Sequence, residues 1–436
     1  MFKNPSPATP APSSSTDGHA AQTTASRRSP LGKFGVLPRL AGPSFLVIGF
    51  FARLPLAMLT VGALTLVTTA SGSYAAGGFA AGAVGLGSAL GAPLLGLLAD
   101  RRGQRIVLLI SAVLNALAIA TLVTVTLTTN DFTPGSLAVV LAASFAMGFT
   151  CPQIGPLARV RWMAMTRRGP RNDMDTALSY EGTADELTFV LGPALVGILA
   201  SLIAPWLPLA VAAVLTITLV SAFAVHPTVL HSDARSMPSD DDRGAAARGI
   251  RPVHVLLPVI GMVAMGTFFG SLQTFLTAFA GQFGLAESAG LIYATMALSS
   301  AFAALSVAYW SERFEHTRRW IASAVGMTAA ATVLALPGGI PGMLVVLFVL
   351  GIFVGPTMVT IFSIGSVVAP GNRLGTVMTM LASGIVAGTA LGSALAGLLA
   401  ESAGASGAAI VPAAAAAALL VMGGASALAL RNVSRD

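Results

Sequence analysis

Residues 105–128, RIVLLISAVLNALAIATLVTVTLT, decide the fold. The stretch holds a single charged residue, Arg105, at its first position. About 20 helical residues cross a hydrocarbon core of roughly 30 Å, and lipid offers no partner to free backbone groups. The stretch therefore predicts a transmembrane helix.

Similar apolar runs follow one another along most of the chain. We expect membrane-spanning helices over residues 44–69, 75–98, 105–128, 136–158, 176–200, 203–225, 254–280, 288–310, 320–337, 342–368, 375–400 and 406–430. The composition agrees, because 55% of the residues are apolar and only 9% are charged, whereas soluble domains carry about 25% charged residues. The predicted fold class is an all-α membrane protein with about twelve transmembrane helices.

The basic residues are confined to one side of the expected spans. All Lys and Arg residues except Arg53 fall in the tails, the central loop or the other even-numbered loops. Because positive charge is retained in the cytoplasm, both termini and the central loop are expected there. This distribution accounts for the net charge of +7 without nucleic acid. The tryptophans fall near span ends, where an aromatic belt is expected: Trp162, Trp206, Trp310 and Trp320.

The chain divides into two halves with internal similarity. The stretches that begin at Thr176 and Thr376 share eight of 26 positions at an offset of 200 residues. Such duplication is common in secondary transporters. We expect a disordered cytoplasmic tail (1–43), a six-helix bundle (44–225), a cytoplasmic linker (226–253), a second, pseudo-symmetric six-helix bundle (254–431) and a short cytoplasmic tail (432–436).

The loop after the second expected helix reads GLLADRRGQR over residues 96–105. It resembles the signature of the major facilitator superfamily, G-x-L-a-D-r-x-G-r-[RK], which lies between that family's second and third helices. Gln104 replaces a basic residue, and the matching residues are Gly96, Asp100, Arg101, Gly103 and Arg105. The resemblance implies that Asp100 stabilises one access state at the N-terminus of the eleventh helix, near Thr376. A plain topology-setting loop is the alternative. The loop SERFEHTRRW of the second half lacks the pattern, so we expect this contact to be one-sided.

The resemblance implies the major facilitator fold and a secondary active transporter that works by alternating access. We favour proton-coupled efflux of a small molecule by a monomer in the cytoplasmic membrane of a bacterium. A metabolite importer, proton-coupled or facilitative, stays open, as does a non-transporting membrane receptor or enzyme. The expected partners are a small-molecule substrate, protons and the lipid bilayer, and no cofactor, metal or enzymatic activity is expected. A Walker A loop, which an ATP-driven pump needs, is missing because both lysines lie in the N-terminal tail.

Ionisable residues inside the expected spans give the sharpest indication of a site, because they usually have a partner or a task. Arg53 in the first span and Asp185 and Glu186 in the fifth lie at matching depths, about nine residues of ~1.5 Å rise from the same membrane face. We predict an ion pair between Arg53 and one of these acids, whereas an unpaired acid could bind and release a proton. Glu181 shares a helix face with Asp185. A purely structural charge cluster, and a surface position for Glu181, are the alternatives.

The fifth span continues into LGPALVG over residues 191–197. Gly192, Pro193 and Gly197 resemble part of the antiporter motif of drug exporters in the family, although Thr188 and Val196 replace two of its glycines. Glycines at i, i+4 spacing in the second and eleventh spans suggest an interface between the halves, with packing inside one half as the alternative.

The family's cavity is lined by its first, fourth, seventh and tenth helices. Polar residues in the last three of these spans are the expected lining: Gln153, Ser271, Gln273, Thr274, Thr357 and Thr360. Hydroxyl groups of this kind also bond to their own helix, which is the alternative. No charge of the second half faces them, which suggests a neutral or cationic, fairly apolar substrate.

Overall fold

The computed structural model describes residues 32–167, 169–233, 252–285, 289–311, 313–370 and 373–433. The described part is helical, without strands. Its first half consists of η1 (Gly32–Gly35), α1 (Val36–Ala41), α2 (Pro43–Phe51), α3 (Leu54–Ser71), α4 (Tyr74–Arg102), α5 (Gln104–Thr128), α6 (Pro134–Phe149), α7 (Ile154–Thr166), α8 (Arg171–Leu202), α9 (Leu207–Leu215), the π-helical η2 (Thr216–Val220), α10 (Ser221–Val225) and α11 (Val229–Asp233). Its second half consists of α13 (Pro252–Gly281), α14 (Ala289–Ser306), η5 (Val307–Tyr309), α15 (His316–Thr332), α16 (Ile340–Val368), α17 (Leu374–Ala408) and α18 (Ile410–Val433).

Eleven helical segments of the described chain are long and apolar enough to cross a membrane. The seventeen-residue α15 is shorter, but it packs between α16 and α18 and completes the second bundle. Together these helices give the predicted twelve passes. Two spans are each built from two helices, because the first breaks between α2 and α3 and the fourth breaks between α6 and α7.

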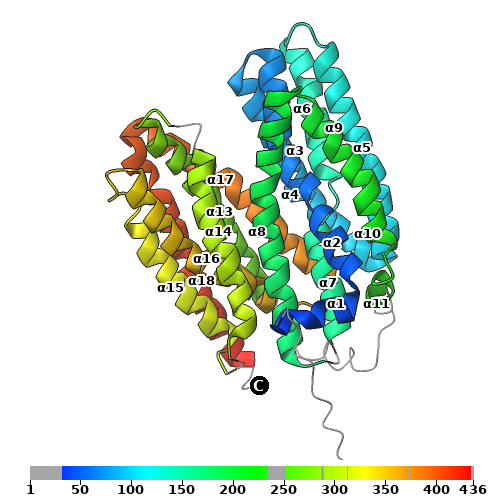
Figure 1. The fold of residues 1–436 in the computed structure, drawn as a ribbon, viewed down its shortest axis with the longest axis vertical. Coiled ribbons are helices and arrows are strands. Elements are labelled where there is room, and N and C mark those ends of the chain that lie inside the picture. Colours follow the sequence, from blue (N-terminus) through cyan, green and yellow to red (C-terminus); the bar gives the residue numbers. More distant parts are fainter. Residues whose placement is uncertain are drawn as a thin grey trace, which may run out of the picture.

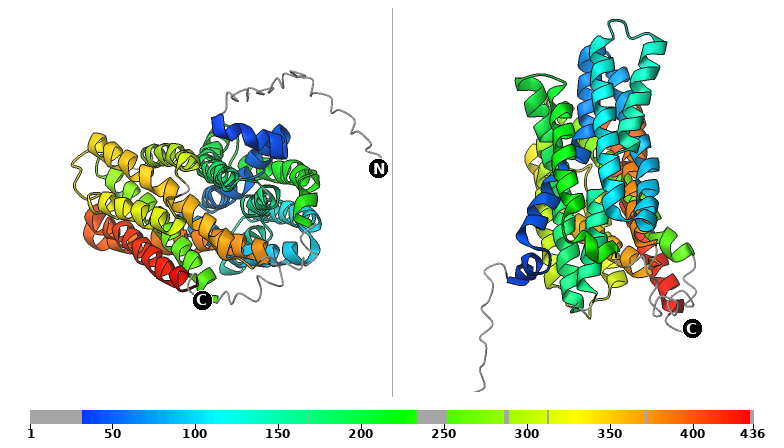
Figure 2. Two further views of the ribbon diagram at one scale, coloured as in Figure 1. Left: turned by 90° about the horizontal axis from the view of Figure 1, so that it is seen from below. Right: turned by 90° about the vertical axis from the view of Figure 1, so that its right-hand side faces the viewer.

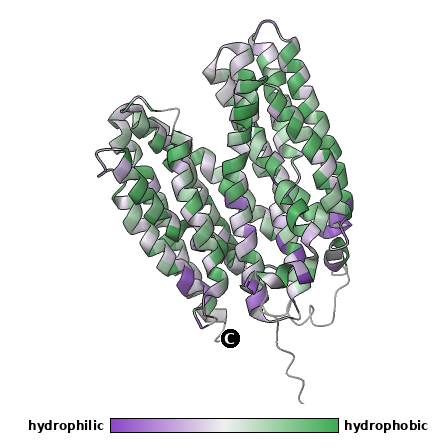
Figure 3. Ribbon diagram, viewed as in Figure 1, coloured by the Kyte–Doolittle hydropathy of each residue, from purple (hydrophilic) through white to green (hydrophobic). Residues whose placement is uncertain are grey.

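The two bundles stand side by side and converge toward the end that carries the C-terminus (Figure 1). The view from below shows α17, in orange, reaching across to the first bundle (Figure 2), where it packs against α4 and α7. Other contacts between the halves join α8 to α14, η5 and α16. Hydrophobic residues cover most of both bundles, and hydrophilic residues gather toward the convergent end (Figure 3).

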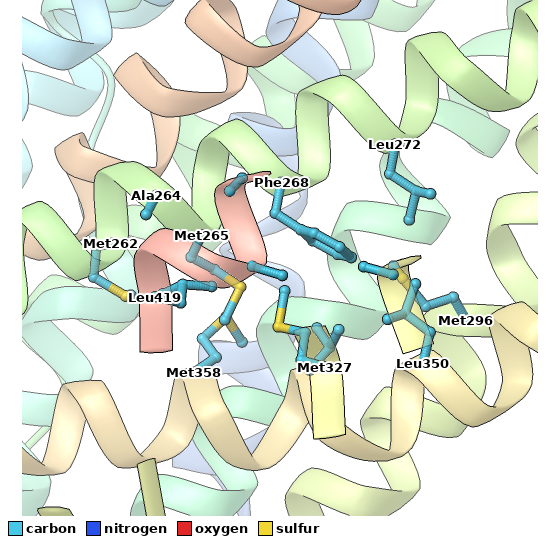
Figure 4. Packing of buried hydrophobic residues seen from close by; sticks show 14 of the residues in the cluster. Met262, Ala264, Met265, Phe268, Leu272, Met296, Met327, Leu350, Met358 and Leu419 are labelled. Carbon is cyan, nitrogen blue, oxygen red and sulfur yellow. The ribbon is translucent and has the colours of Figure 1, made fainter. Parts of the chain in front are cut away.

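The core of the second bundle is rich in methionine. Met265, Met296, Met327 and Met358 pack with Phe268 between α13, α14, α15 and α16 (Figure 4), and all five side chains are buried. Flexible thioether side chains fill irregular gaps between helices. These methionines therefore contribute apolar contacts that hold the four helices together.

Several expectations are corrected at this level. The tail expected to be disordered over 1–43 is helical from Gly32, and Lys33 donates to the carbonyl oxygen of Ala308 in the second half (3.0 Å); residues 1–31 lie outside the described part. Trp162 and Trp320 are fully buried and do not belong to an aromatic belt. Trp162 packs on Phe45, and Trp320 lies against Gly261.

Candidate functional site

The break in the first span directs Arg53 into the protein. Proline has no N–H group and is tolerated in the first turn of a helix, so Pro55 favours a new start at Leu54. Arg53 lies at the break and is only 4% exposed. Its Nη1 donates to the carbonyl oxygen of Gly49 (2.8 Å), which satisfies a carbonyl at the end of α2.

The break in the fourth span spans residues 150–153 and contains Pro152. Cys151 lies in this break and is buried. Gln153 folds back to donate to the carbonyl oxygen of Cys151 (3.0 Å). The new helix α7 begins at Ile154 and continues to Thr166.

Arg159 and Arg161 therefore lie within the fourth span, not in the loop where the sequence placed them. Both are buried, at 1% and 0% exposure. Arg161 points into the first half, where it donates to Gln104 (2.9 Å) and to the carbonyl oxygen of Phe223 (2.8 Å). Arg159 points toward the second half, and its guanidinium lies 3.8 Å from the ring centre of Phe362.

Four ionisable side chains form a network that is buried except at Asp185, which is partly exposed. We call it the charge network: Arg53, Arg159, Glu181 and Asp185. Arg53 forms an ion pair through Nη2 with Glu181, and its Nε atom is 3.1 Å from Oδ1 of Asp185. Arg159 Nη2 donates to Asp185 Oδ2 (2.6 Å). Glu181 also accepts a hydrogen bond from Trp162 Nε1 (2.7 Å) and is 1% exposed, so it does not lie at the surface. The network matches two guanidinium groups with two carboxylates.

A cavity borders the charge network at the boundary between the halves. The cavity is small and partly open to solvent. The first half contributes Arg53, Arg159, Asp185 and Gln153 to its lining, and the second half contributes residues of α16 and α17: Phe362, Ala382, Ser383, Ile385 and Val386. Every ionisable side chain along this lining belongs to the first half.

Of the six polar residues expected to line a cavity, Gln153 does so. The other five are not part of this lining. Ser271, Thr274 and Thr357 donate to carbonyl oxygens of their own helices. Gln273 is exposed, and Thr360 is buried. Phe362 and Ser383 were missed because neither an aromatic nor a lone serine in an apolar run distinguishes a cavity wall.

Glu186 lies apart from the charge network on another face of α8. Its Oε1 accepts a hydrogen bond from Ser300 Oγ of α14 (2.7 Å), which joins the two halves. The residue is 6% exposed, and no ion pair reaches it within the described residues. A second bond between the halves lies nearby, from Thr183 Oγ1 to the carbonyl oxygen of Ala301 (3.1 Å).

Asp100 lies in the last turn of α4 and contacts the N-terminus of α17. Oδ1 accepts from the backbone N–H of Gly375 (2.9 Å), and Oδ2 accepts from the N–H and the hydroxyl of Thr376 (2.7 Å each). An anion is favoured there because the first N–H groups of a helix lack partners within the helix. We call this contact the α4–α17 latch.

The other residues of the signature loop shape its surroundings. Gly96 lies against Gly375 and Thr379, where a side chain would collide. Gly103 has φ +87°, which lets the chain reverse between α4 and α5. Arg101 and Arg105 are exposed, and no hydrogen bond or ion pair joins them to Asp100 in the described part of the chain.

A second charged contact at the convergent end corrects the expectation of a one-sided latch. Asp175, near the start of α8, binds Arg319 Nη1 of α15 (3.0 Å) and lies 3.5 Å from His316 Nε2. At the offset of 200 residues, Asp175 corresponds to Gly375. The two latches therefore occupy related places with different chemistry, which comparison of the loop sequences missed. We call this second contact the α8–α15 latch.

Spans two and eleven pack against each other, as α4 and α17, but most glycines of the i, i+4 patterns serve packing inside each half. Gly87 and Gly91 lie against the backbone of α6, and Gly388 and Gly392 lie against that of α13. In the antiporter-like stretch, Gly192 lies against Ala57 of α3, Pro193 is inside α8, and Gly197 has open space around it.

Comparison with known proteins identifies the architecture. The family model described as Major Facilitator Superfamily matches residues 45–383. No curated protein sequence matches the chain significantly.

Solved structures with the same fold have low sequence identity. FucP, the fucose:proton symporter of E. coli, in its outward conformation, has a TM-score of 0.63 at 15% identity, covering 88% of this chain and 98% of FucP. The human organic anion transporter MFSD10 (TETRAN) has a TM-score of 0.58 at 19% identity, and the match covers 90% of this chain and 99% of MFSD10. A bacterial homologue of the iron transporter ferroportin, outward-facing with soaked iron, has a TM-score of 0.66 at 14% identity. The match covers 88% of this chain and 98% of the homologue. These likenesses confirm the predicted fold class.

Proposed function

Because the chain belongs to the major facilitator superfamily and is therefore a multi-pass secondary transporter of small molecules, we propose that it couples substrate movement to protons and exports its substrate. The observation that carries this proposal is the cavity between the halves, with ionisable groups on one wall and a largely apolar wall opposite. Rocking of one half against the other around such a site is the usual mechanism of two-half transporters.

Glu186 is the proposed proton carrier. Glu181 and Asp185 each face a guanidinium group, whereas Glu186 is held by the neutral hydroxyl of Ser300. This hydrogen bond crosses between the halves, so it must break when α8 and α14 separate. Access of water to the carboxyl group would change in the same step, which links proton binding to the conformational cycle.

Export from the cytoplasm is the proposed direction, supported by the antiporter-like stretch in α8. The confinement of basic residues to one side supports cytoplasmic termini in a bacterial membrane. With this orientation the convergent end is cytoplasmic and the structure is closed on that side. One chain supplies both walls of the cavity, which supports a monomeric transporter.

The test is proton movement in proteoliposomes that contain a pH-sensitive dye. A compound panel is added without an imposed gradient, and substrates are recognised by saturable proton flux. Glu186→Gln should abolish proton flux while the compounds still exchange across the membrane. Glu401→Gln changes an exposed acid on α17 and should behave as the unmodified protein. Full proton coupling in Glu186→Gln would remove this residue from the mechanism, and flux of substrate without protons in the unmodified protein would refute coupling.

A further inference from the structure

The two arginines of the charge network hold more hydrogen-bond donors than the network uses. A guanidinium group carries five N–H donors in a fixed fork. Arg159 uses Nη2 for Asp185, while its Nε and Nη1 are buried without an acceptor in the described structure. Arg53 Nε is within 3.1 Å of Asp185 but lacks the alignment of a hydrogen bond.

These unused donors converge beside one small residue. A Cβ atom placed on Gly155 would lie 3.3 Å from Arg159 Nη1, 3.5 Å from Arg53 Nε and 3.0 Å from Asp185 Oδ1. Gly155, Arg53, Arg159 and Asp185 all line the cavity. The donors of two separate helices therefore meet at the cavity wall beside Gly155, whose lack of a side chain lets them approach this closely.

The surroundings hold this arrangement in place. The ring of Phe362 lies 3.8 Å from the guanidinium of Arg159 and fixes its plane from the second half. Ser383 Oγ, also from the second half, lines the same cavity and has no hydrogen-bond partner in the described residues. The remaining lining is largely apolar, with Leu56 and Val386 among its members.

We propose that the transported molecule is an organic anion with a carboxylate or similar planar oxyanion and an apolar body. Its oxygens accept from Arg159 and Arg53 beside Gly155, while Asp185 keeps Nη2 of Arg159. Charge-assisted bonds to arginine are stronger than neutral ones and favour planar acceptors. The apolar body lies against α16 and α17. This inference rests on the proposed transport function and names its substrate class.

The inference replaces the suggestion of a neutral or cationic substrate. That suggestion rested on the absence of charge from the second half and left out Arg159 of the first half, which the structure places at the cavity. Export remains compatible, because an anion that leaves the negatively charged cell interior moves with the membrane potential.

The test measures binding to the purified full-length protein in nanodiscs, in chloride-free buffer. Three probes of matched size differ in charge: phenylacetate, phenylacetamide and phenethylammonium. Thermal unfolding is followed as each probe is titrated. We expect saturable stabilisation by phenylacetate with a midpoint at least about tenfold lower than for the other two probes.

Three variants locate the site. Arg159→Lys keeps the charge but removes the planar fork, and Gly155→Ala keeps every charge but fills the space beside the donors. Both should abolish the preference for phenylacetate. Arg161→Lys, on the same helix and equally buried, should keep it. If Arg159→Lys does not fold, Gly155→Ala decides alone.

The inference is overturned if the amide or the ammonium probe binds as well as the carboxylate, if no probe stabilises the protein, or if Gly155→Ala keeps the preference. The proton-flux assay separates the two proposals. Binding and coupled movement of the ammonium probe would leave proton coupling intact and refute the anion site. Binding of phenylacetate without proton flux would leave the anion site and refute coupling.

Discussion

Glu181 is the residue whose loss should damage the fold most directly. It pairs with Arg53 and accepts from Trp162 Nε1, and all three side chains are buried. Glu181→Leu leaves Arg53 with Asp185 as its only carboxylate partner. A buried charge that lacks compensation costs about 3–5 kcal/mol. We expect destabilisation of about 3 kcal/mol in reversible unfolding in mixed micelles. The double variant with Arg53→Leu should recover part of this loss; no recovery would mean that the pair does not interact as described.

His226 should make stability depend on pH. It lies just beyond the sixth span, where its ring contacts Ser44 and Thr228 (3.1 Å each). Burial, and then the charge of Arg161, lower the pKa of His226. As the pH falls below the ordinary value of about 6.5, the unfolded chain gains a proton that the folded chain resists, so stability is lost. His226→Gln should reduce the fall in melting temperature between pH 7.5 and 5.5. An equal fall in both proteins would contradict this prediction.

At the scale of single residues, depth along a helix was the most useful information in the sequence. Arg53 and Asp185 were matched because the first and fifth spans start at the same membrane face. Arg159 was missed because its surroundings end the apolar run, although the helix continues to Thr166. Hydropathy measures what faces lipid, and a guanidinium that faces protein is indistinguishable from one in a loop.

Among the helices, the α4–α17 latch should set the balance between access states. Asp100→Asn removes the anion from the N-terminus of α17, a contact worth about 0.3–1 kcal/mol and up to ~2 kcal/mol when partly buried. The fraction of molecules that are closed at the convergent end should therefore fall. Spin labels are attached to cysteines that replace Arg102 of α4 and Arg318 of α15, both exposed. The distance between the two labels is measured by double electron–electron resonance. Asp131→Asn, in the loop between α5 and α6, is the control. An unchanged distance distribution in Asp100→Asn would show that this latch does not bias the states.

The α8–α15 latch should act on the same equilibrium from the other side. Asp175→Asn leaves Arg319 with the backbone oxygens of Phe314 (2.6 Å) and Ser311 (3.1 Å), which limits the damage to the second half. We expect a shift in the same direction as Asp100→Asn, measured with the same labels. Contacts far apart that bias one two-state equilibrium add in free energy. The double variant should therefore shift the distances further than either single variant; a smaller shift would indicate that one latch depends on the other.

The helices themselves were predictable, because lipid forces every apolar run into a helix. Their partners were less so. Gly388 and Gly392 marked a close approach, but small residues specify a distance and not a neighbour, and the neighbour is α13. The breaks at Arg53 and Pro152 were also missed. A break requires other backbone partners nearby, such as the side chains of Arg53 and Gln153, which only the folded molecule brings into place.

For the whole molecule, the division into two bundles followed from the long polar linker and the repeat at an offset of 200 residues. The contact surface between the bundles did not follow, because it depends on which access state the chain adopts. The structure is closed at the end that carries the C-terminus, with both latches formed there.

The orientation in the membrane is the last prediction and concerns the whole chain. The native Cys151 is buried and should not react, so single introduced cysteines report their own surroundings. Asp131 belongs to the exposed loop between α5 and α6, which lies at the far end from the C-terminus (Figure 1). Arg102 is the last residue of α4, next to the α4–α17 latch. With basic loops held in the cytoplasm, an impermeant maleimide should label Asp131→Cys in intact cells and Arg102→Cys only after permeabilisation. The reverse labelling pattern would show that the protein has the opposite orientation in the membrane. The structure would then be closed toward the outside instead of the cytoplasm.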